Sequence, residues 1–138
     1  MNSKGRIMEV FRRNGFRATP QRIAVVQAVL GSKDHPTAEQ VFNRVKERVP
    51  TISLSTVYNT LHTMRDLNMV QELAFNHNHR FDRNTNIHIN MVCENCGEIT
   101  DIERDDLEKE IFEIAKKRRF KITRHRFDLY GICRKCEI

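Results

Sequence analysis

The sequence predicts an α+β fold with two domains, a helical N-terminal domain over residues 1–83 and a small α/β domain over residues 84–138. Apolar residues recur at helical spacing through most of the first domain, whereas shorter strand-like runs dominate the second. All four cysteines lie in the second domain as two C-x-x-C pairs. A small domain buries little apolar surface, so a metal ion that joined the two pairs would stabilise it.

The ends of the first two helices are marked by residue type. An amphipathic helix is predicted over residues 3–13 and is stopped by an Asn-Gly pair. Thr19 begins the second helix, because its hydroxyl caps free N–H groups and Pro20 is tolerated at the first helical position. Gly31 is expected to end this helix.

The next two helices begin at hydroxyl-bearing residues. Thr37 and Gln40 have the spacing of a capping box, and the helix that follows is predicted to end at Pro50. Either Ser53 or Ser55 caps the fourth helix. Its apolar residues are expected to face inward: Leu54, Val57, Leu61 and Met64. Its polar residues are expected to face outward: Thr56, Asn59, His62 and Thr63.

A hairpin follows the fourth helix, which Asn68 is predicted to end in a left-handed conformation. Its strands are expected over residues 69–75 and 79–82, around a polar turn at 76–78. Helices followed by a hairpin form the winged-helix arrangement. The small polar side chains of the fourth helix suit base edges in a major groove. The alternative is an ordinary solvated surface. The outward face of the fourth helix has almost no Lys or Glu, which disfavours that alternative.

The second domain is predicted to contain three strands and one helix. The strands cover residues 87–92, 98–102 and 120–132, and the helix begins at Asp105. Acidic residues open this helix and the basic run 116–119 closes it, as the helix dipole favours. Its apolar face is expected to comprise Leu107, Ile111, Ile114 and Ala115.

The cysteine spacing predicts a structural zinc site. Two C-x-x-C turns offer four thiolates, which suit tetrahedral Zn²⁺ and leave no position for water. Two disulfides or four free thiols are the alternatives, and a reducing cytoplasm disfavours disulfides. The four ligands would be Cys93, Cys96, Cys133 and Cys136.

Charge is distributed unevenly along the chain. Up to Arg83 there are 13 Lys and Arg residues against 7 Asp and Glu, whereas from Asn84 onward there are 11 of each. This asymmetry favours a polyanionic partner, such as nucleic acid, for the first domain. The N-terminus lacks an apolar signal region and no stretch is long enough to span a membrane, so a cytoplasmic protein is expected.

Several motifs in order resemble the Fur family of metal-dependent repressors over nearly the full chain. The matching stretches are 17–22 (RATPQR), 35–39 (HPTAE), 53–59 (SLSTVYN), 80–82 (RFD), 93–97 (CENCG) and 130–133 (YGIC). The resemblance implies an N-terminal winged-helix DNA-binding domain, a C-terminal dimerisation domain with a structural zinc, and a regulatory metal site where the two meet.

The regulatory ligands that the resemblance implies are His35, Asp82, His88 and Asp101. The family usually has a fifth ligand, a histidine, where this chain has Asn90. An amide oxygen is a weaker, harder ligand than imidazole. Asn90 is thus either a ligand or a strand residue without a metal role. The alternative substitutes are two histidines of the hairpin, His77 and His79.

The acidic ligands point to one branch of the family. The iron-uptake branch usually has Glu where this chain has Asp82 and Asp101, whereas the peroxide-sensing branch usually has Asp. A further family site requires polar residues at positions occupied here by Ile87 and Ile89, so it is expected to be absent. His125 remains from that region and is expected to be structural. The resemblance implies Fe²⁺ or Mn²⁺ as the regulatory ion.

The sequence therefore predicts a homodimeric repressor that binds a double-stranded DNA operator and senses peroxide through iron-catalysed oxidation of His35 or His88. The expected DNA contacts are Arg17, Arg22, Ser55, Thr56, Tyr58 and Asn59. One alternative is an iron, manganese or zinc uptake regulator without peroxide chemistry. Another is a zinc-stapled module that does not bind DNA. An enzyme is not expected, since a closed zinc shell and the lack of a βαβ pattern disfavour hydrolase and oxidoreductase chemistry.

Overall fold

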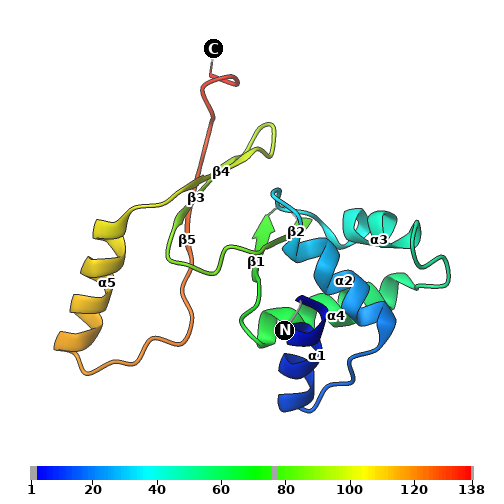
Figure 1. Cartoon of the computed structure of the whole chain (residues 1–138). Helices are drawn as coiled ribbons and strands as arrows, with labels where there is room; N and C mark the ends of the chain where they lie inside the picture. Colours follow the sequence, from blue (N-terminus) through cyan, green and yellow to red (C-terminus); the bar gives the residue numbers. More distant parts are fainter. Residues whose placement is uncertain (1–2, 76–77, 138) are drawn as a thin grey trace. The chain divides into compact units, whose positions relative to one another are not determined.

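Five helices and five strands make up the computed structural model, which describes residues 3–75 and 78–137 (Figure 1). The helices are α1 (Ser3–Arg13), α2 (Pro20–Leu30), α3 (Ala38–Lys46), α4 (Leu54–Asp66) and α5 (Asp105–Lys117). The strands are β1 (Gln71–Phe75), β2 (Asn78–Asp82), β3 (Ile89–Cys93), β4 (Ile99–Ile102) and β5 (Phe127–Gly131). The predicted α+β fold is confirmed, and the chain divides into two compact units, Met1–Thr85 and Asn86–Ile138.

Local hydrogen bonds explain where three helices of the first unit, α2, α3 and α4, begin. The Thr19 hydroxyl accepts from the Arg22 amide at the start of α2. Thr37 forms both halves of the predicted capping box with Gln40 at the start of α3. Ser53, one of the two serines considered, caps α4. Each cap satisfies a backbone donor that the helix leaves free.

Two details of the helices predicted for the first unit are wrong. The third helix ends at Lys46, and the chain has already turned at Glu47 and Arg48 before Pro50. Pro50 is therefore not the residue that ends it. Leu54 was expected to face inward but lies in the first turn of α4 with 37% of its surface exposed. The first turn of α4 thus lies outside the core, against which the later turns pack.

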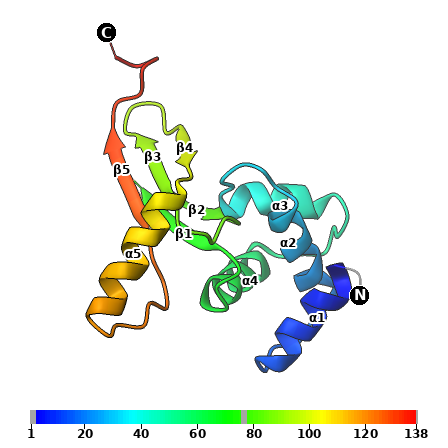
Figure 2. The same cartoon turned by 60° about the vertical axis from the view of Figure 1, so that its left-hand side comes forward.

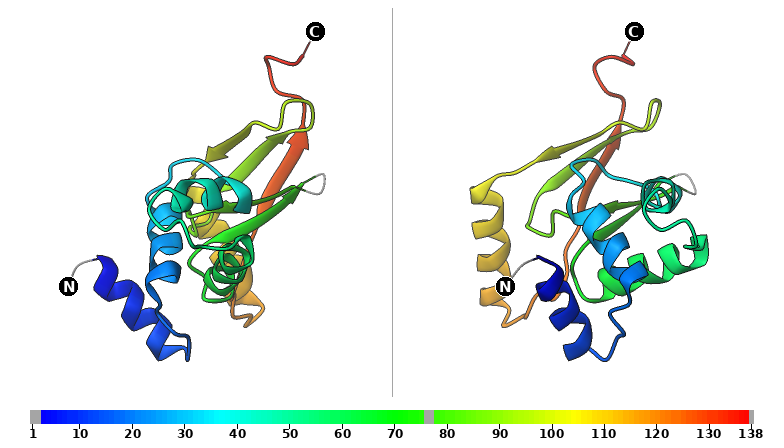
Figure 3. Two further views of the ribbon diagram at one scale, coloured as in Figure 1. Left: turned by 90° about the vertical axis from the view of Figure 1, so that its right-hand side faces the viewer. Right: turned by 45° about the vertical axis from the view of Figure 1, so that its right-hand side comes forward.

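The core of the first unit is built around α2, which contacts α1, α3 and α4 (Figure 3). Val57, Leu61 and Met64 of α4 are fully buried, as predicted. Phe11 of α1 and Phe81 of β2 are the largest fully buried aromatic side chains of this core. Because this core contains side chains from every helix of the unit and from β2, the hairpin and the helices stabilise one another.

The hairpin of the first unit follows directly from the end of α4. Asn68 has φ 62°, the left-handed conformation predicted for it. Strands β1 and β2 pair antiparallel, from Gln71 with Asp82 to Phe75 with Asn78. The predicted polar turn at 76–78 falls mainly on residues outside the described part of the chain. The segment before α3 pairs with β2 at one position, because Thr37 forms an isolated β-bridge with Arg80.

The second unit contains a three-stranded sheet in the order β4-β3-β5 (Figure 2). β3 pairs antiparallel with β4 and parallel with β5. The long connection that parallel pairing requires between β3 and β5 comprises β4 and α5. The last strand begins at Phe127, whereas the prediction began it at residue 120. β3 begins at Ile89, two residues after the predicted start at Ile87.

Helix α5 begins with acidic residues and ends with basic ones, as predicted. Of its expected apolar face, Ala115 is buried, but Ile114 is 61% exposed. The prediction that Ile114 belongs to the inward face of this helix was therefore wrong, since its side chain is exposed in the monomer. Among the described residues, no helix combines the length and the apolar character that a bilayer span requires.

Candidate metal centres and nucleic-acid interface

The four cysteines converge at the end of the second unit. Their sulfur atoms all lie within 4.8 Å of one another. Each C-x-x-C pair sits in a tight turn: the Gly97 amide donates to the Cys93 carbonyl, and the Cys136 amide donates to the Cys133 carbonyl. These turns aim two sulfurs from each segment at a common centre.

The sulfur geometry fits zinc. Zn–S bonds of about 2.3 Å in a tetrahedron place neighbouring sulfurs about 3.8 Å apart. The Sγ atoms of Cys96 and Cys133 are 3.8 Å apart. The described cluster therefore has the spacing of a closed structural zinc shell, with sulfurs from the β3–β4 turn and from the segment after β5.

The pKa values of two of the thiols, Cys93 and Cys96, are shifted in opposite directions. Backbone amides of Cys96 and Cys133 donate to the Cys93 sulfur and lower the pKa of Cys93 to about 6. A backbone hydrogen bond at Glu98 lowers the pKa of Cys96, but the neighbouring sulfurs and burial outweigh it and raise that pKa to about 11. Four thiolates close together repel one another, and the positive charge of a bound Zn²⁺ would offset that repulsion and favour the deprotonated thiols.

His35 and Asp82 are brought together within the first unit. The Phe81 amide donates to the Pro36 carbonyl at 2.9 Å, so the segment before α3 runs beside β2. This pairing places Nε2 of His35 3.4 Å from Oδ2 of Asp82, with side chains 11% and 5% exposed. An imidazole and a carboxylate at this distance form a preassembled pair of metal-ligand atoms.

His88, Asn90 and Asp101 are brought together within the second unit. Nε2 of His88 lies 3.1 Å from Oδ1 of Asn90 and 4.0 Å from Oδ1 of Asp101. His88 immediately precedes β3 and Asn90 is its second residue, so these side chains, two positions apart in an extended segment, lie on the same side. Asp101 is paired opposite Asn90 across β3 and β4. Two of the predicted regulatory residues, Asn90 and Asp101, therefore approach the imidazole nitrogen of a third, His88.

Asp128 joins this cluster and was missed by sequence reasoning. It lies in β5 beside Asn90, whose amide nitrogen donates to Oδ1 of Asp128 at 3.2 Å. Nothing in the local sequence marks it, because 37 residues separate the two positions and only the parallel register of β3 and β5 brings them together. Asp128 also accepts from Arg126, which approaches its other carboxylate oxygen.

The remaining histidines have other surroundings. Nδ1 of His79 is 2.9 Å from Glu72, which also accepts from Arg65 at 2.6 Å, so His79 belongs to a polar cluster of the hairpin. His77 lies outside the described residues. His125 stacks on Phe127, and its pKa is lowered first by burial and then by the repulsion that a protonated His88 would exert. These contacts agree with the structural role expected for His125.

The predicted DNA-contact residues occupy two parts of the first unit. Along α4, Ser55, Tyr58 and Asn59 are exposed and Thr56 is half-buried. Arg17 is exposed in the connection between α1 and α2. Arg22 donates to the Arg17 carbonyl at 2.9 Å, so part of its role is to hold that connection. Tyr58 also packs against His62 on the next turn, with ring centroids 6.2 Å apart.

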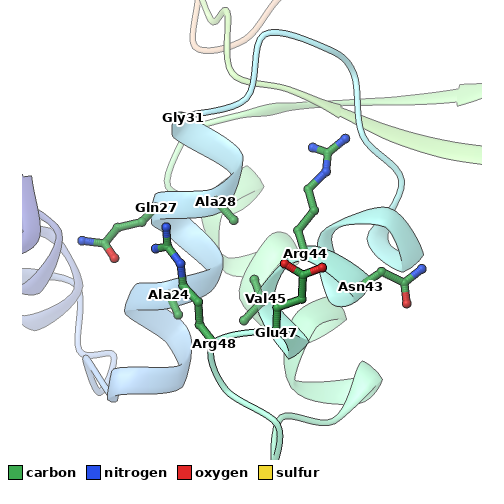
Figure 4. A pocket seen from close by; sticks show the side chains of 9 residues that line it. All are labelled: Ala24, Gln27, Ala28, Gly31, Asn43, Arg44, Val45, Glu47 and Arg48. Atoms are coloured by element: carbon green, nitrogen blue, oxygen red, sulfur yellow. The ribbon is translucent and has the colours of Figure 1, made fainter.

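A groove of about 460 Å³ lies between α2 and α3 in the first unit (Figure 4). Arg44 lies beside it and donates to Asp34 at 2.7 Å. These hydrogen bonds from Arg44, together with one from Ser32, lower the pKa of Asp34 to about 2. None of the predicted metal or DNA-contact residues lines this groove, and Arg44, one of its two arginines, is engaged in an ion pair with Asp34.

The chain is similar to several characterised proteins. The model of the ferric uptake regulator family matches residues 13–130. A peroxide-responsive repressor PerR from Staphylococcus epidermidis is 37% identical over 128 residues, which cover 91% of this chain and 85% of that protein. PerR from Streptococcus pyogenes, solved in a study of peroxide sensing and gene regulation, is 30% identical with a TM-score of 0.55, covering 99% and 95% of the two chains.

A second solved structure supports the fold alone. The ferric uptake regulator from Pseudomonas aeruginosa, solved with manganese, has a TM-score of 0.81 at 24% identity. The match covers 96% of this chain and 99% of that chain.

Proposed function

This chain belongs to the ferric uptake regulator family, and on that premise we propose that it is a metal-dependent transcriptional repressor that senses peroxide. It acts as a homodimer on a double-stranded DNA operator in the cytoplasm. The four cysteines bind a structural zinc ion, and Fe²⁺ or Mn²⁺ binds at a regulatory site. The observation that carries this proposal is the preassembly of the regulatory ligands as two separate groups, one in each unit.

The regulatory ion takes ligands from both groups. His35 and Asp82 already lie 3.4 Å apart in the first unit, and His88 and Asp101 lie 4.0 Å apart in the second. An ion bound by both groups restrains the polar segment 83–86 that connects them. Because only one relative arrangement of two winged helices fits successive major grooves, metal binding becomes coupled to DNA binding.

Exposed apolar side chains of the second unit support the homodimer. Ile114 and Phe112 of α5 are 61% and 51% exposed, and Leu129 of β5 is 56% exposed. Large contiguous patches of exposed apolar side chains mark interaction surfaces. A second copy of the unit would cover them and would account for the residues of α5 that do not face the unit's own core.

Mixed nitrogen and carboxylate ligands suit Fe²⁺ and Mn²⁺. Bound Fe²⁺ would mediate the transfer of two electrons from a ligand imidazole to H₂O₂, so that one oxygen atom is inserted into an imidazole C–H bond and the other leaves as water. We expect this modification at His35 or His88, the two imidazoles among the proposed ligands. An oxidised imidazole is a poorer ligand, so its formation releases the two units from each other and the protein from DNA.

Operator binding with Mn²⁺ or Fe²⁺, each with and without H₂O₂, tests this proposal. We expect both metals to promote binding, and we expect mild peroxide to abolish binding only in the Fe²⁺ form. Mass spectrometry should then find one added oxygen atom in a peptide that contains His35 or His88. The Mn²⁺ form, treated with the same peroxide, is the control for damage elsewhere. An Fe²⁺ form that stays bound and unmodified would instead indicate an uptake regulator without peroxide chemistry.

We propose that α4 enters the major groove, because Tyr58 and Asn59 are exposed polar side chains on a helix of the basic unit. We expect Tyr58→Ala and Asn59→Ala each to weaken specific operator binding by about 1–3 kcal/mol at fixed salt. Asn43→Ala is the matched control, since it truncates an exposed asparagine on α3. Fluorescence anisotropy with operator and scrambled duplexes measures both affinity and specificity. If both α4 variants retained the wild-type preference for the operator, a different element would have to read the bases.

A further inference from the structure

We propose that Asp128 orients the amide of Asn90 so that its carbonyl oxygen points at Nε2 of His88 and serves as an oxygen ligand of the regulatory ion. This inference rests on the proposed function, because it concerns the same metal site. Asn90 is 1% exposed in the central strand of its sheet, with its amide between His88 and Asp128. Asp128 is a positioning residue in this scheme and does not contact the ion.

The carboxylate decides which end of the amide faces which neighbour. An ionised Asp128 only accepts hydrogen bonds, so the amide of Asn90 must turn its NH₂ group toward it. The donor–acceptor distance from Nδ2 of Asn90 to Oδ1 of Asp128 is 3.2 Å. The other carboxylate oxygen is held by Arg126 and by the Tyr130 hydroxyl at 3.4 Å. With both of its oxygens engaged, Asp128 is itself fixed in orientation.

The opposite end of the amide meets an imidazole nitrogen that also has a lone pair. Nδ1 of His88 lies 2.7 Å from the Asn86 carbonyl, which only accepts, so Nδ1 carries a hydrogen. In the neutral ring Nε2 then presents its lone pair to Oδ1 of Asn90 at 3.1 Å. Two lone pairs at this distance repel each other, and a cation between them turns the repulsion into attraction.

The same distance fits two ligand atoms of one ion. Metal bonds of about 2.1 Å at right angles place neighbouring ligand atoms about 3.0 Å apart. An oxygen here, in place of a further imidazole nitrogen, makes the site harder and favours Mn²⁺ or Fe²⁺ over Zn²⁺. Asp128 therefore influences metal preference by determining that Asn90 offers oxygen and not NH₂.

Asp128→Asn tests the inference. The substitution preserves the shape of the side chain but replaces a carboxylate that only accepts hydrogen bonds with an amide that can also donate one. Arg126 and Tyr130 would retain the oxygen of the new amide, so its NH₂ group would face Asn90 and force that amide to turn over. We expect Mn²⁺ affinity of the full-length, zinc-loaded protein, measured by calorimetric titration, to fall by about 10-fold or more. Asp106→Asn is the matched control, since Asp106 is also bound by an arginine, Arg104, and faces solvent.

Two double variants separate positioning from general destabilisation. In an Asn90→Ala background, Asp128→Asn should cause no further loss of Mn²⁺ affinity, because the residue through which it acts is gone. Asn90→Asp should restore Mn²⁺ affinity in the Asp128→Asn background, because a carboxylate presents oxygen in either orientation. An unchanged affinity in Asp128→Asn, or an equal loss with Asn90→Ala present, overturns the inference.

Controls distinguish failure of this inference from failure of the proposed function. If the wild-type protein binds no ion beyond its structural zinc, both fail. If His88→Ala abolishes Mn²⁺ binding and Asp128→Asn does not weaken it, only the inference fails. Should Asp128→Asn lose its structural zinc, Asn90→Leu carries the test: a roughly 10-fold loss of Mn²⁺ affinity supports ligation by Asn90, and wild-type affinity overturns it.

Discussion

Cys96→Ser is expected to lose one zinc ion per chain and to unfold the second unit. The sulfur of Cys96 lies 3.8 Å from that of Cys133, so its removal opens the shell that joins the segment after β5 to the β3–β4 turn. Structural zinc contributes about 10–16 kcal/mol of apparent binding free energy in small domains, which exceeds the net stability of most of them. Among the described residues of this unit, the buried apolar side chains are few: Ile87, Val92, Cys93 and Ala115.

Elemental analysis, circular dichroism and size-exclusion chromatography measure this outcome. The variant should lack zinc and elute as a monomer, while the helices of the first unit persist because their core is separate. Asn95→Ala is the matched control, since it alters an exposed residue of the same turn that is not a ligand. A folded, dimeric, zinc-free Cys96→Ser protein would contradict the structural role of the site.

His88→Ala is expected to keep the structural zinc and the fold but to lose metal-activated DNA binding. Its Nε2 is the point on which Asn90 and Asp101 converge, and the side chain is 1% exposed. Without this nitrogen the second unit retains only the oxygen ligands of Asn90 and Asp101. An ion bound by them would link the second unit to the first unit more weakly. Loss of a coupling of about 1–3 kcal/mol reduces metal-dependent operator affinity by about 5–150-fold.

The measurement is operator binding across a Mn²⁺ titration, with zinc content determined on the same preparation. His125→Ala is the matched control, because it removes a histidine of the same unit that stacks on Phe127. We expect His125→Ala to respond to metal as the wild type does. Superimposable titration curves for His88→Ala and wild type would refute the assignment of His88 to the regulatory site.

The helix starts were predictable from sequence because capping is a local interaction. Thr19, Thr37 and Ser53 each accept from an amide three residues later, so the signal and the structure lie within one turn. The two C-x-x-C pairs are equally local, since each turn fixes two sulfurs by itself. The exposure of Leu54 and Ile114 was not predictable, because helical spacing defines a face but not how much of that face is covered.

The sequence by itself therefore determined the helix boundaries set by caps, the cysteine cluster and, through its motifs, the family. Only the tertiary structure decided which polar groups meet. His35 reaches Asp82 because backbone pairing joins the segment before α3 to β2. Asp128 reaches Asn90 because β5 aligns with β3 in one register, and a shift of one residue would turn Asp128 to the opposite face. Long-range pairing of this kind depends on the whole sheet, which no local spacing encodes.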